Sequence, residues 1–296
     1  MAVFVAAVLA GLAIGSIYGL IGIGFTVIYN ATRVFNLAQG DLVLVGVMMS
    51  FVMLDVAHQS EIVAFITVMA SVMAVAAIEE RFVVRPFLKK TGAGAFGWFI
   101  ATLGFSAIIE GVVTWRFGQH PIVSIPSPFP LTGVSFGSVI LGYRQIFVIG
   151  VFLVVIAFLE VFYSRTWMGQ AMRGTAEDRE AASLRGINPI AMSRSAFLMA
   201  GAIAGVAGFV IAPITLSDPN VGLKFTLEGF LALAIGGFGS IRGAVVGGLL
   251  LGVCEQLFGA YVSANYVIMV GLILVLLVLT VRPQGLFKSS TPLRTV

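Results

Sequence analysis

Long apolar stretches separated by short polar breaks run along the whole chain. A bilayer core of about 30 Å is crossed by roughly 20 residues of α-helix, and most of the stretches approach this length. They predict membrane spans at residues 2–29, 41–57, 61–78, 95–115, 146–163, 195–215, 226–238, 243–260 and 265–281. The first stretch is long for one pass and the seventh is short. The pattern therefore predicts an all-α polytopic membrane helix bundle of about eight to ten spans.

The composition leads to the same class of protein. Of the 296 residues, 59% are hydrophobic and only 10% are charged, whereas a soluble globular protein carries about 25% charged residues. We expect one membrane domain over residues 1–296, with little chain left for a soluble domain. The first apolar stretch has no basic region before it. It is therefore predicted to be a retained helix and not a cleaved signal peptide.

The basic residues are distributed unevenly between the two sides of the predicted bundle. If the N-terminus lies outside, the outward connections hold Arg116, Arg144 and Lys224. The other 14 of the 17 basic residues fall in inward connections: Arg33, Arg81, Arg85, Lys89, Lys90, Arg165, Arg173, Arg179, Arg185, Arg194, Arg242, Arg282, Lys288 and Arg294. Cytoplasmic loops are enriched in such residues. We therefore expect a multi-pass protein of the bacterial inner (plasma) membrane with a cytoplasmic C-terminus, and the basic pI needs no nucleic-acid partner.

The chain lacks the usual sequence devices for catalysis and cofactor binding. A single cysteine, Cys254, and two distant histidines, His58 and His120, leave no disulfide framework and no metal site. The glycine-rich run 236–243 lacks the lysine of a phosphate-binding loop and follows a helical pattern. No H-E-x-x-H motif occurs. We expect a non-catalytic protein without a cofactor.

Small residues recur at four-residue intervals in several spans. This spacing lets helix backbones approach closely in lipid. It predicts tight helix packing within one subunit, or alternatively a face for a second subunit. The spaced pairs and triplets are Gly11, Gly15 and Gly19; Gly201 and Gly205; Gly243 and Gly247; and Gly248 and Gly252.

Few acidic residues lie within the predicted spans; apart from Asp41, Asp55 and Glu61 close to span ends, they are Glu110, Glu160, Glu228 and Glu255. Glu110, Glu160 and Glu228 are within two turns of a span end, where long side chains reach the interface at little cost. Glu255 lies nearer the middle of its span. It either has a polar role in the interior, along a transport pathway, or makes an ordinary interhelical hydrogen bond. An ion-coupled secondary transporter would usually carry more such groups, and this class stays an alternative.

A polar patch of Asn36, Gln39 and Asp41 interrupts two apolar runs, with Gly40 as a helix breaker. Asn36 or Gln39 is predicted to cap the helix that follows, and Asp41 in its first turn suits the positive end of the helix dipole. Transporters often place broken-helix starts at the membrane midplane, where free amides meet polar substrate groups. The segment is either such a pathway element or a plain cytoplasmic turn.

The longest inward hydrophilic stretch covers residues 164–194. Thr175, with Asp178 three residues on, predicts a capping box for a helix over residues 176–185, which Gly186 would end. Asn188 and Pro189 then predict the start of the next helix. A short capped helix between two spans suits docking against a partner. The alternative is a solvated surface helix.

Four motifs in order resemble the branched-chain amino acid permeases of the LivH type. They are Asn36-Leu37-Ala38-Gln39-Gly40-Asp41, the run from Gly169 to Asn188, residues 235–240 with Gly243, and Arg282-Pro283-Gln284-Gly285-Leu286-Phe287. Many family members carry a histidine and then Gly-Glu where this chain has Gln39 and then Gly40-Asp41. The motifs span almost the whole chain.

The resemblance implies the membrane domain of a type II importer of the ATP-binding cassette (ABC) class. The implied partners are a second related permease, two cytoplasmic ATP-binding subunits and an extracytoplasmic substrate-binding protein. The implied cargo is a branched-chain or other small amino acid, while relatives carry urea, short amides or aromatic carboxylates. The implied ATPase-docking residues are Ala176, Glu177, Asp178, Ala181, Ala182, Leu184, Arg185 and Gly186. Asn36, Gln39, Asp41 and Glu255 are the predicted pathway residues.

Overall fold

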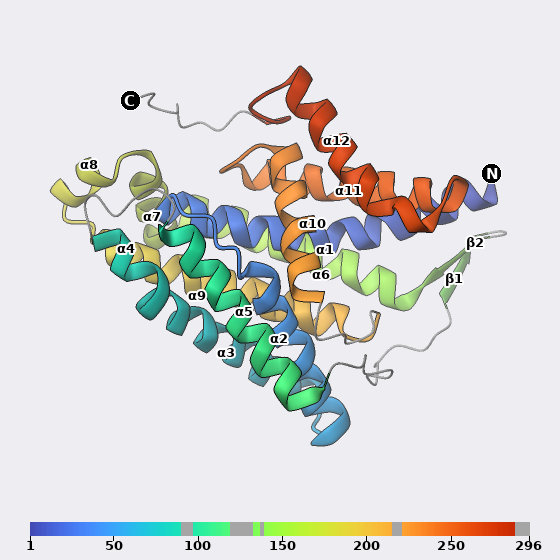
Figure 1. Cartoon of the computed structure of the whole chain (residues 1–296), viewed down its shortest axis with the longest axis horizontal. Coiled ribbons are helices and arrows are strands. Elements are labelled where there is room, and N and C mark those ends of the chain that lie inside the picture. Colours follow the sequence, from blue (N-terminus) through green and yellow to red (C-terminus); the bar gives the residue numbers. More distant parts are fainter. Residues whose placement is uncertain (90–96, 119–132, 137–138, 215–220, 288–296) are drawn as a thin grey trace.

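The computed structural model describes residues 1–89, 97–118, 133–136, 139–214 and 221–287, and it is almost entirely helical (Figure 1). The first half contains α1 (Ala2–Thr32), α2 (Gln39–Phe51), the π-helical turn η1 (Val52–Val56), α3 (Glu61–Glu79), η2 (Glu80–Val84), α4 (Arg85–Lys89) and α5 (Gly97–Phe117). The second half contains α6 (Tyr143–Arg165), α7 (Trp167–Glu177), α8 (Arg179–Leu184), α9 (Pro189–Ile211), α10 (Val221–Gly236), α11 (Ile241–Tyr261), η3 (Ala264–Tyr266) and α12 (Val267–Val281).

The predicted all-α membrane bundle is confirmed. Seven of the described helical segments are long and apolar enough to cross a bilayer. The shorter helices α10 and α12 match the predicted stretches 226–238 and 265–281. The first apolar stretch forms one continuous helix of 31 residues. An antiparallel hairpin of β1 (Gly133–Phe136) and β2 (Val139–Gly142) lies in the connection between α5 and α6, most of which is outside the described residues.

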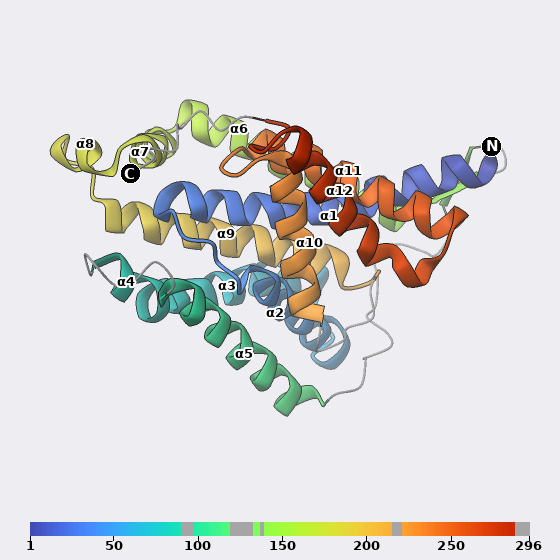
Figure 2. The same ribbon diagram turned by 45° about the horizontal axis from the view of Figure 1, so that its top comes forward.

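The helices form a bundle around α1. Helices α1, α6, α9 and α11 run roughly along the long axis, and α10 crosses them steeply (Figure 2). The N-terminus and the β-hairpin lie at one end of the bundle, and α4, α7 and α8 lie at the other (Figures 1 and 2). The second end is the one that carries the predicted inward loop.

Glycines allow the closest helix contacts. A Cβ atom added at Gly15 would lie 2.7 Å from the carbonyl oxygen of Gly248, and one at Gly11 would lie 2.6 Å from the Cα of Val253. The four-residue spacing on α1 therefore meets that on α11, within one subunit. Gly205 of α9 packs against α3 in the same way, because its Cβ would lie 3.0 Å from the Cα of Met69. Close backbone approach of this kind is the main source of helix association in lipid.

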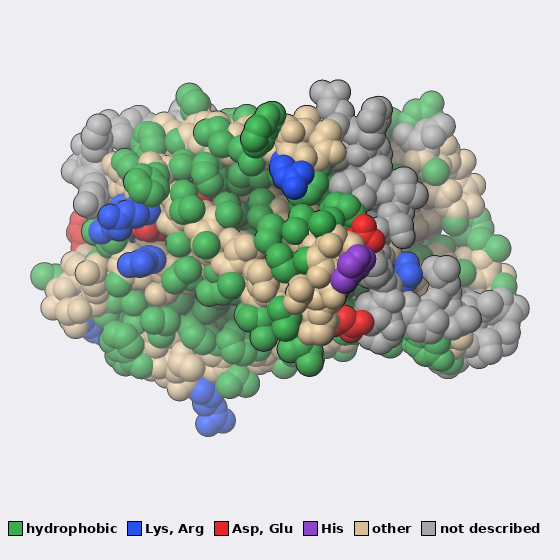
Figure 3. Space-filling view, turned by 90° about the horizontal axis from the view of Figure 1, so that it is seen from below, with side chains coloured by type: hydrophobic (Ala, Val, Ile, Leu, Met, Phe, Trp, Pro, Cys, Tyr) green, Lys and Arg blue, Asp and Glu red, His purple; other side chains and the backbone are tan. Residues whose placement is uncertain are grey.

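The outer face of the bundle is apolar. Figure 3 shows hydrophobic side chains over most of one face, with few charges among them. Large apolar side chains exposed on α3 and α5 include Ile62, Ile66, Ile108 and Val112. A surface of this kind is unfavourable in water and suits contact with lipid tails or with another membrane helix.

Candidate functional site

The chain turns back into the bundle between α1 and α2. Arg33 ends α1 in a left-handed conformation (φ 60°), and an extended segment returns toward the centre, where α2 begins (Figure 1). Asn36, Ala38 and Gln39 in this return are fully buried. The break expected in the polar patch is present, and it puts the start of α2 inside the protein and not in a solvated turn.

The local capping differs from the prediction. The N-cap of α2 is Ala38, so neither Asn36 nor Gln39 occupies that position. Instead, the Asn36 Oδ1 accepts a hydrogen bond from the Ala38 N–H at 2.9 Å, and its Nδ2 donates to Glu79 Oε2 at 3.0 Å. A hydrogen bond across to α3 therefore fixes Asn36 outside the helix. Asp41 does lie in the first turn of α2, as predicted.

A threonine on α10 completes the start of α2. The Thr226 hydroxyl accepts a hydrogen bond from the Gly40 N–H at 3.0 Å and donates to the Leu37 carbonyl at 3.1 Å. A Cβ atom at Gly40 would overlap the Thr226 hydroxyl and the backbone of Gly222. Gly40 is therefore required for the close crossing of α2 and α10. It lies in the first turn of α2 and does not break a helix as predicted, because the break falls between Arg33 and Ala38.

Two carboxyl groups are enclosed at this site. Asp41 and Glu79 are both fully buried. The buried Gln39 side chain lies against Gly24 of α1, whereas the Asp41 carboxyl lies against Gly222 of α10. Sequence reasoning missed Glu79 because it follows the predicted span 61–78 and was counted with the inward connection. A longer predicted span would have included Glu79, because α3 continues without a break through this residue.

A second polar cluster joins α1, α10 and α11. Tyr18 donates a hydrogen bond to Glu255 Oε2 at 2.9 Å, and the Glu228 carboxyl is within hydrogen-bonding reach of Glu255. Glu255 is buried, as its central position suggested. Glu228 is buried too, with 2% of its surface exposed. The expectation that Glu228 reaches the interface is wrong, because Glu228 lies on the face of α10 that packs into the bundle, while the neighbouring Leu227 is exposed. The structure thus separates Glu255 from the cluster around Asp41.

The inward loop forms two short helices and not the single predicted one. Thr175 lies inside α7, where its hydroxyl donates to the Ala171 carbonyl, so it caps nothing. The N-cap of α8 is Asp178, whose Oδ1 accepts hydrogen bonds from Glu180 N–H at 2.9 Å and Ala181 N–H at 3.0 Å. An aspartate competes effectively for the N-cap position. The predicted helix 176–185 is therefore broken at Asp178.

The predicted end of this helix and the start of the next are confirmed. Gly186 follows α8 with φ 81°, a left-handed conformation that favours glycine. Asn188 caps α9 by accepting from the Ile190 N–H at 3.0 Å, and Pro189 occupies the first turn.

The predicted docking residues divide into exposed and buried groups. Ala181, Arg185 and Gly186 are exposed, and Leu184 is exposed over 89% of its surface. Ala182 is buried and holds α8 against the rest of the protein. Residues Ala176 and Glu177 line a cavity behind the loop. The tip of α8 thus presents one large apolar side chain in an otherwise polar surround.

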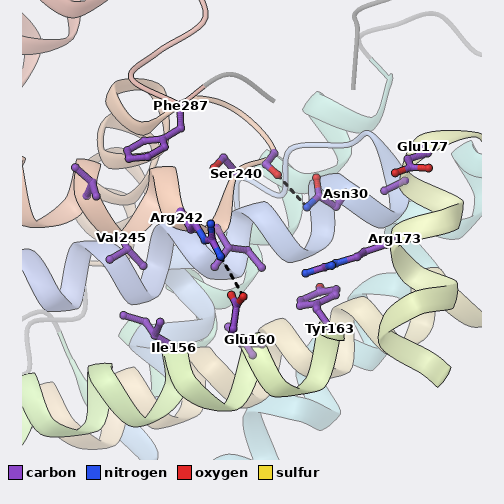
Figure 4. Close-up of a pocket in the computed structure, with 15 residues that line it drawn as sticks. Asn30, Ile156, Glu160, Tyr163, Arg173, Glu177, Ser240, Arg242, Val245 and Phe287 are labelled. Atoms are coloured by element: carbon purple, nitrogen blue, oxygen red, sulfur yellow. Dashed lines mark hydrogen bonds and ion pairs between the residues drawn. The ribbon is translucent and has the colours of Figure 1, made fainter. Parts of the chain in front are cut away.

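That cavity, of about 610 Å³, lies where α1, α6, α7 and α11 meet, at the end of the bundle that carries α7 and α8 (Figure 4). Arg242 forms an ion pair with Glu160 at 3.1 Å across its mouth. The Arg173 guanidinium lies over the Tyr163 ring, 5.6 Å from its centroid. On the α1 side, the Arg33 guanidinium donates to the Ala176 carbonyl. A hydrogen bond therefore connects the loop of α7 and α8 directly to the end of α1. From that end the chain returns to the start of α2.

Two of the sequence motifs are in contact at the same end. The Leu286 N–H donates to the Ile235 carbonyl and the Phe287 N–H to the Gly236 carbonyl, both at 2.9 Å. Gly237 and Gly285 both adopt positive φ where these segments cross. The last carbonyls of α10 are thereby satisfied by the segment that follows α12.

A multi-pass helical bundle with a polar helix start in its interior is typical of a membrane transport subunit. The comparisons identify its family. The model of the family described as "Branched-chain amino acid transport system / permease component" matches residues 7–280. The chain belongs to this family, and the resemblance to LivH-type permeases is confirmed.

Individual relatives agree over nearly the full length. The high-affinity branched-chain amino acid transport system permease protein LivH of Salmonella typhimurium is 32% identical, covering 93% of this chain and 92% of the relative. The corresponding permease protein BraD of Pseudomonas aeruginosa is 31% identical, covering 93% of both. Among solved structures, PsaBC from Streptococcus pneumoniae in complex with Fab has a TM-score of 0.51 at 11% identity, covering 96% of this chain and 93% of that one. This last likeness concerns the fold alone.

Proposed function

We propose that this chain is the permease subunit of an ATP-driven importer and moves branched-chain or related small amino acids across the bacterial inner membrane. The observation that carries the proposal is the family match over residues 7–280. The whole chain acts as one permease domain, and residues 164–194 form its docking segment. ATP hydrolysis belongs to partner chains.

The proposed partners are a second related permease, two cytoplasmic ATP-binding subunits and an extracytoplasmic binding protein that delivers the substrate. The exposed tip of α8 supports an ATPase contact, because an apolar side chain held at a rigid helix end suits a groove in another protein. The Arg33–Ala176 contact supports a coupling role for the loop. Movement of the loop would act on the end of α1 and, through the chain that follows, on the start of α2.

The function is tested by uptake into proteoliposomes that contain the importer, with the ATPases facing the added ATP and the binding protein on the opposite side. We expect uptake of labelled L-leucine that requires ATP and persists when an ionophore collapses ion gradients. Uptake that follows an ion gradient without ATP would identify a secondary transporter instead. Uptake of urea, a short amide or an aromatic carboxylate in place of leucine would assign the chain to one of the other substrate classes.

The proposed topology, with the N-terminus outside and the C-terminus inside, is tested by cysteine labelling. Cys254→Ser removes the one native thiol, and Ser60→Cys and Ser183→Cys each introduce one at an exposed position. An impermeant maleimide should label Cys at position 60 in right-side-out vesicles and Cys at position 183 in inside-out vesicles from cells without the ATPases. The parent without cysteine should stay unlabelled. Labelling of both positions from one face would contradict this topology. Ser124 is also predicted to lie outside, but it falls outside the described residues.

A further inference from the structure

A small basic cavity lies between the end of α3 and the start of α9. Its volume is about 150 Å³, and its lining includes three arginines, one acidic residue and two large apolar residues: Arg81, Arg85, Arg194, Glu80, Ile78 and Phe82. It lies at the end of the bundle that carries α4 and α8 (Figure 2). It shares no lining residue with the larger cavity beside α7 and is a separate site.

The π-helical turn η2 shapes one wall of this cavity. A hydrogen bond runs from the Arg85 N–H to the Glu80 carbonyl, five residues earlier. Pro86 follows, and it has no N–H with which a regular helical ladder could continue. The turn buries Glu80 and leaves Arg81 exposed beside the cavity. Single π-helical turns inside α-helices are frequent at functional sites.

Close packing of α9 against α3 supplies the opposite wall. A Cβ atom added at Gly201 would lie 2.8 Å from the Cβ of Ala76, so the two helices approach closely here. At the start of α9, the Ser193 hydroxyl donates a hydrogen bond to the Glu80 carboxyl at 3.4 Å. Arg194 follows directly and lines the cavity. Two helices that are distant in the sequence therefore build one site.

Positive charge is in excess in the cavity. Glu80 is the one acidic residue among the described residues that line it, against three arginines. The ion pair formed within the described ranges joins Arg242 to Glu160, so none of the three arginines takes part in one. In the same ranges, the Arg85 Nε is buried without a hydrogen-bond partner. A buried donor without a partner is costly, and a phosphate group offers guanidinium groups both acceptors and negative charge.

An apolar stripe on the outer face of α3 leads to the cavity. It has four exposed side chains at four-residue intervals: Ile66, Ala70, Ala74 and Ile78. Phe82 continues this spacing and is 68% exposed, and the Arg81 guanidinium lies 5.9 Å from the centroid of its ring. The two alanines leave the middle of the stripe shallow, so that an acyl chain can lie along it. An apolar path that ends at unpaired positive groups matches the chemistry of an anionic lipid.

We propose that this cavity binds the phosphate of an anionic phospholipid through Arg81, Arg85 and Arg194, with one acyl chain along the stripe of α3. Basic pockets between membrane helices at the cytoplasmic side recognise such headgroups, and the proposed topology places this end of the bundle in the cytoplasmic leaflet. The bound lipid joins α3 to α9, the helix that follows the inward loop. The site does not depend on which solute the importer carries.

The test uses the purified importer in a neutral detergent, with bound molecules counted by native mass spectrometry. Three probes are titrated: dioctanoyl phosphatidylglycerol, which is anionic; dioctanoyl phosphatidylcholine, which has the same chains and no net charge; and inorganic phosphate, which has no chain. We expect saturable binding of the phosphatidylglycerol, at least about tenfold tighter than that of either other probe. Arg85→Gln and Arg194→Gln should each weaken it by about tenfold or more, because each removes one charge-assisted hydrogen bond.

The matched control is Arg165→Gln, which removes the same charge from an exposed position at the end of α6. It should bind phosphatidylglycerol as the unmodified protein does. Size-exclusion chromatography checks that each variant assembles, and Arg194 is exposed, so its replacement leaves the packing of α9 in place. Equal binding of phosphatidylcholine would indicate an unspecific detergent-like contact, and equal binding of inorganic phosphate a site for a free anion. Either result, or full phosphatidylglycerol binding by both assembled variants, would overturn the lipid site.

Discussion

Replacing Leu184 with aspartate is expected to abolish ATP-driven uptake while leaving the permease assembled in the membrane. Leu184 is the last residue of α8, and 89% of its surface is exposed in the isolated chain. A large apolar side chain at the tip of a capped helix gains most when a partner covers it. A charge placed in such a contact without a partner costs several kcal/mol, and we expect ATPase affinity to fall by about 100-fold or more.

The matched control is Ser183→Asp, which adds the same charge one residue earlier on a different face of α8. Co-purification of the ATPases and leucine uptake are measured for both variants. Ser183→Asp should retain more of each activity than Leu184→Asp. Normal uptake by Leu184→Asp would show that α8 is a solvated connector and does not dock on the ATPase.

Replacing Gly248 with alanine is expected to produce a large loss of stability. A Cβ atom at this position would lie 2.6 Å from the Cα of Gly19 and 2.8 Å from the carbonyl oxygen of Gly15. Both are backbone atoms, so α1 and α11 must separate to admit the methyl group. Overpacking in a close-packed core costs about 1–3 kcal/mol. A lower thermal unfolding midpoint in detergent and a lower membrane yield should follow.

Gly111→Ala in α5 is the control for this prediction. A Cβ at Gly111 meets no described atom within 4 Å, and alanine is the better helix former by about 1 kcal/mol. Its unfolding midpoint should be unchanged or slightly raised. Equal midpoints for the Gly248→Ala and Gly111→Ala variants would contradict the role of close α1–α11 packing.

Much of the architecture could be predicted from the chain itself. A segment without charges longer than about 18 residues has few alternatives to a membrane helix, because unpaired backbone groups are costly in lipid. Tight helix packing was predicted from the four-residue glycine spacing on α1 and α11. The left-handed backbone after α8 was predicted from Gly186. Each depends on steric limits of neighbouring residues, which are local and therefore readable in one sequence.

Predictions that involved a choice between nearby groups were less successful. Thr175 and Asp178 are both good N-cap residues, and the pattern of one turn cannot tell which is used. The outcome followed from packing: Thr175 is buried within α7, and Asp178 caps α8 in its place. The two-helix form of residues 164–194 was missed for this reason.

The sequence by itself determined that this protein is a membrane helix bundle, where most helices begin and end, and which family it resembles. Only the tertiary structure decided which polar groups share a site. It joined Asn36 to Glu79, 43 positions away, and Tyr18 to Glu255, 237 positions away, and it buried Glu228 within the bundle. The physical reason is that helix formation depends on neighbouring residues, whereas burial and pairing of a side chain depend on which distant helix crosses it and at what angle.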